Sequence, residues 1–274
     1  PYVRGKVTSK KIDDILFEAE QLVSNGYKEI VLTGIHLGAY GKETGYQLNI
    51  INVLEELQAL PGLERIRLSS IEVNEVTDDL IDLIADSDRV CPHFHLPLQS
   101  GDDYILKRMN RKYDAAQYLE TVERIRGRLE LPSISTDILV GFPGEKRIHF
   151  ENTMKLCEQA GFSRAHIFSY SPREDTPAAK MPDHCKPSDI KERKKELEFL
   201  TAETSLEYKN LFVGRDIGIL VEKERDKKTG KLCGYSDRYI KALFDGPDDL
   251  MNEIADVHVE SVSPQSVMGK CYQH

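Results

Sequence analysis

The feature that most constrains the fold of this chain is an alternation of apolar, β-branched runs with helical patterns between residues 12 and 168. Five runs predict buried strands, at residues 29–33, 65–69, 93–98, 134–140 and 165–168. Apolar residues at helical spacing precede the first run, at Ile12, Ile15, Leu16, Ala19 and Leu22. Strands and helices that alternate in this way form a parallel sheet wrapped by helices. We therefore expect an α/β fold whose sheet is open or closed into a barrel.

The predicted alternation of helices and strands begins with a helix, at residues 11–23, and not with a strand. In a parallel βα series each crossover helix follows a strand. We therefore expect the first strand and its loop to lie upstream of Pro1, so that the chain opens in the middle of a βα unit.

The pattern changes after His184. Residues 186–210 predict one long, charged helix, with Pro187 and Ser188 as start signals. Short alternating segments follow, IGILVE, YIKALF and ADVHVESV, and turn sequences separate them. They predict a small antiparallel β barrel of the size used for oligonucleotide binding. We divide the chain into a partial parallel barrel lacking its first strand at 1–185, a connecting helix at 186–211 and the small barrel at 212–274.

The charge balance argues against a general binder of polyanions, because the formal net charge is −9. Two local basic clusters nevertheless occur, one at Lys107, Arg108, Arg111 and Lys112 and one at Arg164, Arg173, Lys180 and Lys186. Taken alone, each cluster is typical of a solvated helix face.

The five cysteines lie far apart and form no C-x-x-C pair. We therefore expect no disulfide and no local zinc site, and we assign no metal-ligating residue. The sequence shows no apolar run long enough to span a bilayer and no secretory signal pattern. We expect a cytoplasmic protein without a membrane partner.

The loops that follow the predicted strands are the expected site of chemistry, since the carboxyl ends of parallel strands carry the functional loops of such folds. They read TGIHLGAYG, SSIEVNE, PLQSGDD, GFPGE and SYSPRED. Their glycines allow the backbone to approach a ligand, and Ser70, Glu72, Gln99 and Glu145 supply hydrogen-bonding groups. Five such loops at one edge predict a binding site.

The chain resembles the radical SAM methylthiotransferases that modify tRNA. The resemblance rests on segments in family order and spacing: PYVRGK, EIVLTGIHLGAYG, IRLSSIEVNEVTDDL, HFHLPLQSGDDYILKRMNRKY, STDILVGFPGE and FSYSPREDTPAA. The C-terminal piece resembles the TRAM domain, a small RNA-binding β barrel that ends these enzymes. The resemblance implies a radical-SAM-type barrel followed by an OB-like barrel.

The resemblance also implies what the longer enzyme carries. In this family a C-x-x-x-C-x-x-C motif immediately precedes the PYxRG segment, and a further domain with three cysteines comes before it. Two 4Fe-4S clusters and S-adenosylmethionine are the cofactors, and an electron donor protein and the tRNA anticodon arm are the partners. Neither cysteine motif is present in this sequence. We therefore expect this chain to be an inactive C-terminal fragment of a radical enzyme.

The resemblance also bears on which substrate within the family the enzyme modifies. The family acts on isopentenyladenosine, on N6-threonylcarbamoyladenosine or on an aspartate of a ribosomal protein. The loop LTGIHLGAYG, with LSSIEVNE, resembles the threonylcarbamoyladenosine type, whereas the isopentenyl type usually carries G-Q-N-V there. We expect methylthiolation of threonylcarbamoyladenosine at position 37 of tRNA, and the other two substrates stay open.

The resemblance assigns site residues by their matching positions, without identifying a catalytic residue. Cofactor-binding positions are Thr33, His36, Ser70, Glu72, Gln99, Asp137, Gly141, Pro143, Gly144 and Glu145. Candidate substrate-binding residues are Arg4, Arg111, Tyr170 and Arg173. His93 and His95 share one strand face, and we expect them to line the barrel or pack there rather than bind a metal. Two departures from the family pattern are Lys146, in place of a threonine, and Asp175, in place of a glycine.

Two interpretations outside this enzyme family remain as alternatives. One is a catalytically inert RNA-binding relative, against which the missing strand argues, because it would leave an open sheet edge. The other is a phosphate-binding barrel enzyme of unrelated chemistry. That interpretation requires an acid–base pair in the loops, for which few residues besides Glu72, Glu145 and His36 qualify.

Overall fold

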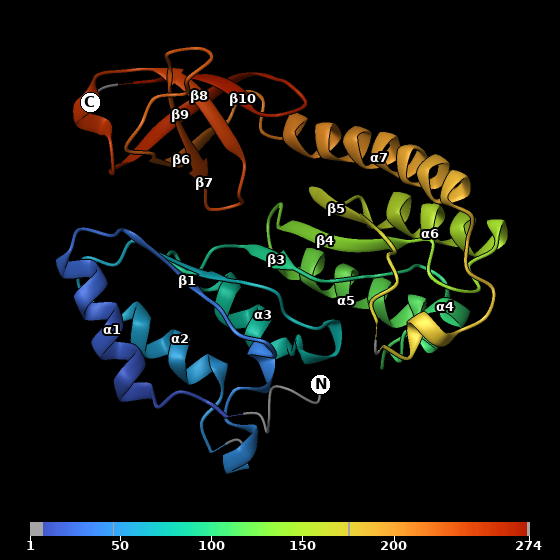
Figure 1. Ribbon diagram of the computed structural model, residues 1–274. Helices are drawn as coiled ribbons and strands as arrows, with labels where there is room; N and C mark the ends of the chain where they lie inside the picture. Colours follow the sequence, from blue (N-terminus) through green and yellow to red (C-terminus); the bar gives the residue numbers. More distant parts are fainter. Residues whose placement is uncertain (1–7, 46, 175, 273–274) are drawn as a thin grey trace.

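The computed structural model describes residues 8–45, 47–174 and 176–272. Its N-terminal part alternates helices and strands as the sequence predicts (Figure 1). In chain order these are α1 (Ile12–Ser24), β1 (Glu29–Leu32), α2 (Ile50–Gln58), β2 (Arg65–Leu68), α3 (Asp78–Ala85), β3 (His93–His95), α4 (Asp103–Arg108), α5 (Ala115–Arg128), β4 (Ser133–Val140), α6 (Arg147–Ala160) and β5 (Arg164–Ser169).

All five strands run parallel, which confirms the expected fold class. β1 pairs with β2, and β3, β4 and β5 form a second run of parallel pairs. Isolated bridges, Ile66 to Val90 and Ser70 to His95, join β2 to the β3 segment. The strands therefore follow one another side by side in chain order.

The third strand ends three residues earlier than the sequence predicts. Pro97 has no amide hydrogen, and the Leu98 N–H donates to the Thr136 hydroxyl at 3.0 Å instead of to a backbone carbonyl. Regular pairing therefore stops at His95, although the segment continues beside β4 as far as Gln99.

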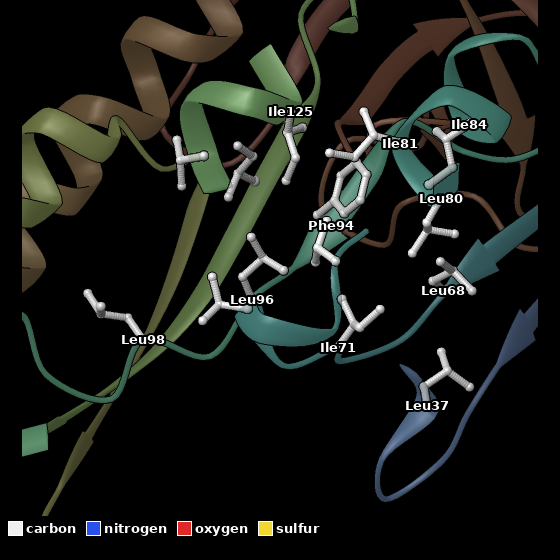
Figure 2. Close-up of a cluster of buried hydrophobic side chains, with 14 of the residues drawn as sticks. Leu37, Leu68, Ile71, Leu80, Ile81, Ile84, Phe94, Leu96, Leu98 and Ile125 are labelled. Atoms are coloured by element: carbon white, nitrogen blue, oxygen red, sulfur yellow. The ribbon is translucent and has the colours of Figure 1, made fainter. Parts of the chain in front are cut away.

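The apolar core fills the space between one face of the strands and the helices that cover it. Figure 2 shows Phe94 close to Ile81 of α3 and Ile125 of α5. Phe94, Ile134 and Ile138 are buried on this face. Because side chains alternate along a strand, His93, His95, Ser133 and Ser135 point to the opposite face. The core therefore fixes which polar side chains face the inside of the partial barrel.

A long helix leads from the parallel part to the C-terminal part. α7 (Pro187–Asn210) packs against β5 and α6, and Leu197 is fully buried in the main core. The Thr204 hydroxyl donates to the Phe162 carbonyl at 3.2 Å, and the Tyr208 hydroxyl donates to the Leu131 carbonyl at 2.9 Å. The helix is therefore anchored along its length.

The C-terminal part is a closed five-stranded barrel with its own apolar core. Its strands are β6 (Asp216–Val221), β7 (Leu232–Ser236), β8 (Lys241–Asp245), β9 (Ile254–Val262) and β10 (Val267–Cys271). The expectation of a purely antiparallel barrel is wrong for one pair, since β10 runs parallel to β8 while it runs antiparallel to β9. Closing the barrel requires this pair, because β10 fills the gap between β8 and β9.

Two barrel strands contain a glycine at a close backbone contact. A Cβ at Gly234 of β7 would lie 2.1 Å from the Leu220 carbonyl oxygen, and a Cβ at Gly269 of β10 would lie 2.2 Å from the His258 carbonyl oxygen. Any side chain would push the neighbouring strands apart. The small barrel therefore depends on both glycines.

Buried arginines of β2 join the two parts of the chain. The Arg67 guanidinium binds the Glu29 carboxylate at 2.8 Å and donates to the carbonyls of Asp237 at 2.6 Å and Ser236 at 3.1 Å. Only 1% of Arg67 is exposed, and its guanidinium lies 4.3 Å from the Tyr239 ring centroid. This side chain of β2 thus satisfies groups from β1, from the last residue of β7 and from the turn after β7.

No helix among residues 8–45, 47–174 and 176–272 is long and apolar enough to cross a membrane.

We predict that Arg67→Met lowers the free energy of unfolding by about 3–5 kcal/mol, because it leaves the Glu29 carboxylate and two carbonyls unpaired at a buried interface. Arg215→Met is the matched control. Arg215 also joins the two parts, through Glu130 at 2.7 Å, but both side chains are at least half exposed, so its loss costs about 1 kcal/mol or less. Urea unfolding followed by circular dichroism measures both values, and equal losses would contradict this role of Arg67.

Candidate functional site

The carboxyl ends of the strands carry the predicted site residues of β1 and β2. Thr33 and Ser70 are exposed there. The His36 ring, about half exposed, lies 4.0 Å from the Glu75 carboxylate. Burial raises the pKa of Glu75, although backbone N–H donors and His36 act in the opposite direction. The edge therefore offers hydroxyls and an imidazole to a ligand.

Glu72 and Arg111 meet at this edge. The Arg111 guanidinium donates to the Glu72 carboxylate at 2.9 Å, and each side chain is about one-quarter exposed. The sequence predicts the first residue for the cofactor and the second for the substrate. In the structure they form one ion pair between the loop after β2 and the segment after α4.

Gln99 and Asp137 also come together. The Gln99 N–H donates to the Asp137 carbonyl at 2.8 Å, and the Gln99 carbonyl accepts from the Leu139 N–H at 2.9 Å. Gln99 has a positive φ of 63°, which turns the chain away from β4. The Asp137 carboxylate itself lies 3.3 Å from His95 Nε2 on the inner face of the sheet.

The GFPGE loop is held by side chains of its own chain. Glu145 is buried, and its carboxylate binds Arg193 of α7 at 2.7 Å and the Gly141 N–H at 3.1 Å. Burial raises the pKa of Glu145, and the Arg193 guanidinium opposes this shift. The Pro143 carbonyl accepts from Arg108 at 3.0 Å. Glu145 therefore fixes the loop to α7, an interaction that the local sequence does not reveal.

The two glycines of this loop have structural roles. Gly141 has φ 83° and Gly144 has φ 88°, values that side chains rarely allow. A Cβ at Gly141 would also lie 2.4 Å from the Ile190 side chain. The loop can therefore keep this close approach to α7 only with glycine.

Two of the predicted substrate-binding residues, Tyr170 and Arg173, follow β5. The Tyr170 hydroxyl is buried and has no hydrogen-bond partner among the described residues, and its ring packs against Phe142 and His184. Arg173 is exposed. Arg4 lies outside the described residues, as does Asp175, the residue that replaces a glycine of the family pattern.

A cavity of about 750 Å³ lies on the inner face of the parallel sheet. Residues from the sheet, the C-terminal end of α7 and the small barrel surround it, among them Arg67, Ser70, His93, His95, Ser135, Asp137, Arg164, His166, Lys209 and Tyr239. Two of the predicted site residues, Ser70 and Asp137, lie on its wall. The cavity volume is in the range of small-molecule sites.

A hydrogen-bonded series of side chains crosses this wall. Ser135 Oγ lies 3.1 Å from His93 Nε2 and 2.9 Å from His95 Nδ1, and His95 Nε2 lies 3.3 Å from Asp137. The expectation that both histidines line the barrel is confirmed. Sequence reasoning missed Ser135, whose signal is the inward register with Ser133 and Asp137 along β4.

The cysteines of this chain do not fit an iron–sulfur cluster. Cys91, Cys157 and Cys233 are buried, and the described residues contain no group of three or more His, Cys, Asp or Glu side chains that could hold a metal ion. Burial raises the pKa of Cys91 to about 12, so it stays a thiol and not the thiolate that binds iron.

The buried His93 generates a prediction about pH. Burial, then Arg67, His95 and Arg164, lower its pKa from the ordinary 6.5 to about 3. Between these values the unfolded chain binds a proton that the folded chain does not. The free energy of unfolding therefore falls as the pH decreases from about 6.5 toward about 3, by about 1.4 kcal/mol per pH unit for this one group.

His93→Gln removes this contribution, so we predict that its stability falls less steeply than that of the unchanged chain below pH 6.5. Urea unfolding at a series of pH values measures the difference between the two slopes. Parallel curves for the two proteins would show that His93 does not titrate in this way.

The sequence of this chain is similar to a family model and to proteins of known name. A family model described as the Radical SAM superfamily matches residues 1–157. The threonylcarbamoyladenosine tRNA methylthiotransferase MtaB of Thermotoga maritima is 39% identical over 263 residues, which are 96% of this chain and 59% of that protein. The tRNA-2-methylthio-N(6)-dimethylallyladenosine synthase of Alkaliphilus oremlandii is 36% identical over 273 residues, which are 100% of this chain and 58% of that protein. The chain thus spans about three fifths of the length of these relatives.

Solved structures show a similar fold at low sequence identity. Coproporphyrinogen III oxidase (HemN) from Escherichia coli, a radical SAM enzyme, superposes with a TM-score of 0.53 at 15% identity, over 73% of this chain and 48% of that chain. Methylornithine synthase (PylB) gives a TM-score of 0.50 at 13% identity, over 73% and 56% of the two chains. The family model covers more than half of the chain, and the chain therefore belongs to the radical SAM superfamily.

Proposed function

We propose that this chain is the C-terminal part of an enzyme that adds a methylthio group to N6-threonylcarbamoyladenosine at position 37 of tRNA. The observation that carries the proposal is a sequence similarity that runs through both parts of the chain. It covers the parallel sheet and the small barrel together, at 39% identity to a protein named for this activity.

The choice of substrate rests on finer features. The loop after β1 reads TGIHLGAYG, which resembles the threonylcarbamoyladenosine type. Relatives named for dimethylallyladenosine are 36% identical to this chain, close to the 39% of the first relative. Identity alone therefore does not separate the two substrates, and the isopentenyl-type substrate is the second candidate.

We assign S-adenosylmethionine to the carboxyl edge of the sheet. When bound together with a reduced cluster, this cofactor would supply a radical that removes hydrogen from an unreactive carbon of the substrate. The exposed hydroxyls of Thr33 and Ser70 can receive its polar groups, as can His36 and Gln99. The Glu72–Arg111 pair presents both charges to a zwitterion. The GFPGE loop, including Gly141, Pro143, Gly144 and Glu145, supports this edge from the side of α7.

Among the described residues, no group of three or more His, Cys, Asp or Glu side chains could hold a metal ion. We place the cluster ligands in the portion of the relatives that this chain does not cover, so we propose that the chain alone does not generate the radical. An electron donor protein is then a partner of the whole enzyme. We assign the small barrel to the tRNA anticodon arm, and Tyr170 and Arg173, after β5, remain candidate substrate-binding residues.

We predict that RNA from cells lacking the gene for this protein loses 2-methylthio-N6-threonylcarbamoyladenosine and accumulates its precursor without the methylthio group. Mass spectrometry of digested tRNA measures both nucleosides, and a plasmid copy of the gene is the control that restores the first. Loss of 2-methylthio-isopentenyladenosine instead would assign the second candidate substrate. No change in either nucleoside would contradict a tRNA substrate.

A further inference from the structure

The inner cavity is lined by far more positive than negative side chains. Its lining contains the basic residues Arg67, Arg164, Lys209, Arg238 and Lys241. Asp137 is the one carboxylate among the described lining residues. The cavity therefore suits a negatively charged ligand, although the whole chain is acidic.

Three of the five basic groups already have carboxylate partners. Arg67 binds Glu29 at 2.8 Å, Arg238 binds Asp237 at 2.6 Å and Lys241 binds Asp226 at 3.2 Å. Arg164 and Lys209 have no carboxylate within ion-pair distance among the residues that the structure describes. These two cations remain available to a ligand.

Arg164 and Lys209 offer one exposed and one buried positive charge to the same cavity. Arg164 is the first residue of β5 and is exposed, so its guanidinium is accessible from the cavity. Lys209 is buried, and its ammonium group donates one hydrogen bond, to the Pro264 carbonyl at 2.6 Å. An ammonium group has three N–H donors, so two stay unused. A buried cation without a counter-charge is costly unless a ligand supplies one.

The two groups lie close enough to repel each other. After burial, the Arg164 guanidinium is the second cause that lowers the pKa of Lys209, and the same guanidinium helps to lower the pKa of His166 and of His93. An anion between these groups would remove the repulsion. The hydroxyl of Ser205 lines the same cavity and can add a neutral hydrogen-bond donor.

We propose that Arg164 and Lys209 form an oxyanion subsite that holds the carboxylate of the substituent on N6 of the substrate adenosine. This proposal rests on the proposed function and deepens it. A threonylcarbamoyl group carries a carboxylate, whereas a dimethylallyl group is neutral and apolar and would leave both cations uncompensated. Unpaired polar groups in a site discriminate strongly against the ligand that fails to pair them.

The register of the sheet connects this subsite to the carboxyl edge. Ser135 pairs with Arg164, and Asp137 pairs with His166 one step nearer that edge. The cavity reaches from Arg164 to Ser70 and Asp137. A substrate base in the cavity can therefore place its charged substituent near Arg164 while the base lies toward the edge assigned to the cofactor.

The test measures binding of this chain to three synthetic anticodon stem-loop RNAs by fluorescence anisotropy. They carry threonylcarbamoyladenosine, isopentenyladenosine or unmodified adenosine at position 37. We expect the first RNA to bind about tenfold more tightly than the unmodified RNA, since a hydrogen-bonded charge pair contributes on this order. Arg164→Gln abolishes that preference. Lys155→Gln, which removes one positive charge from an exposed position of α6, leaves it unchanged.

Other outcomes show whether the anion at this subsite is the carboxylate or a backbone phosphate. They also separate a failure of the subsite proposal from a failure of the proposed function. A backbone phosphate at this subsite would make Arg164→Gln weaken all three RNAs equally, which overturns the carboxylate assignment. A preference for threonylcarbamoyladenosine that survives Arg164→Gln overturns the subsite while the proposed function stands. A preference for the isopentenyladenosine RNA contradicts the proposed function itself. Circular dichroism verifies that the variants fold, and Arg164 is exposed, so its replacement leaves the core intact.

Discussion

The buried guanidinium of Arg67 is the interaction on which the rest of the structure depends. It binds Glu29 of the neighbouring strand and the carbonyls of Ser236 and Asp237 in the small barrel, while Tyr239 covers its face. Arg65 adds hydrogen bonds to the carbonyls of Gly218 and Tyr235, at 2.7 and 3.0 Å. Backbone carbonyls of the barrel thus replace water around two cations of β2. Both parts of the chain are held in one orientation.

That orientation creates the inner cavity. Strands of the parallel sheet form its wall with His93, His95 and Ser135, and Tyr239 of the small barrel packs against His93 with the ring centroids 5.2 Å apart. The carboxyl edge of the sheet carries the loops that we assign to the cofactor, and the opposite half of the cavity carries Arg164 and Lys209. The fold can therefore separate two tasks along one surface. In the proposed enzyme, cofactor binding belongs to one edge, and recognition of the charged substituent belongs to the other.

Local patterns predict the strands and helices well, and they predict the site only in part. Phe94, Ile134 and Ile138 mark β3 and β4 because apolar periodicity is a local property. The closing strand β10 is missed because Gly269 and Lys270 interrupt its pattern, and its parallel pairing with β8 depends on barrel closure. Glu145 pairs with Arg193 across 48 residues, and Arg164 belongs to a cluster that resembles a solvated surface. These roles arise only when distant segments meet, so local sequence cannot reveal them.

The measurement that tests the central claim most directly is anaerobic iron–sulfur reconstitution of this chain beside the full-length protein, followed by an assay of S-adenosylmethionine cleavage. We propose that this chain supplies the cavity and a small barrel that binds RNA, and that the cluster ligands lie in the portion of the relatives that this chain does not cover. The full-length protein should therefore bind iron and cleave the cofactor, and this chain should do neither. About four irons per chain together with cofactor cleavage by this chain alone would contradict that division of roles.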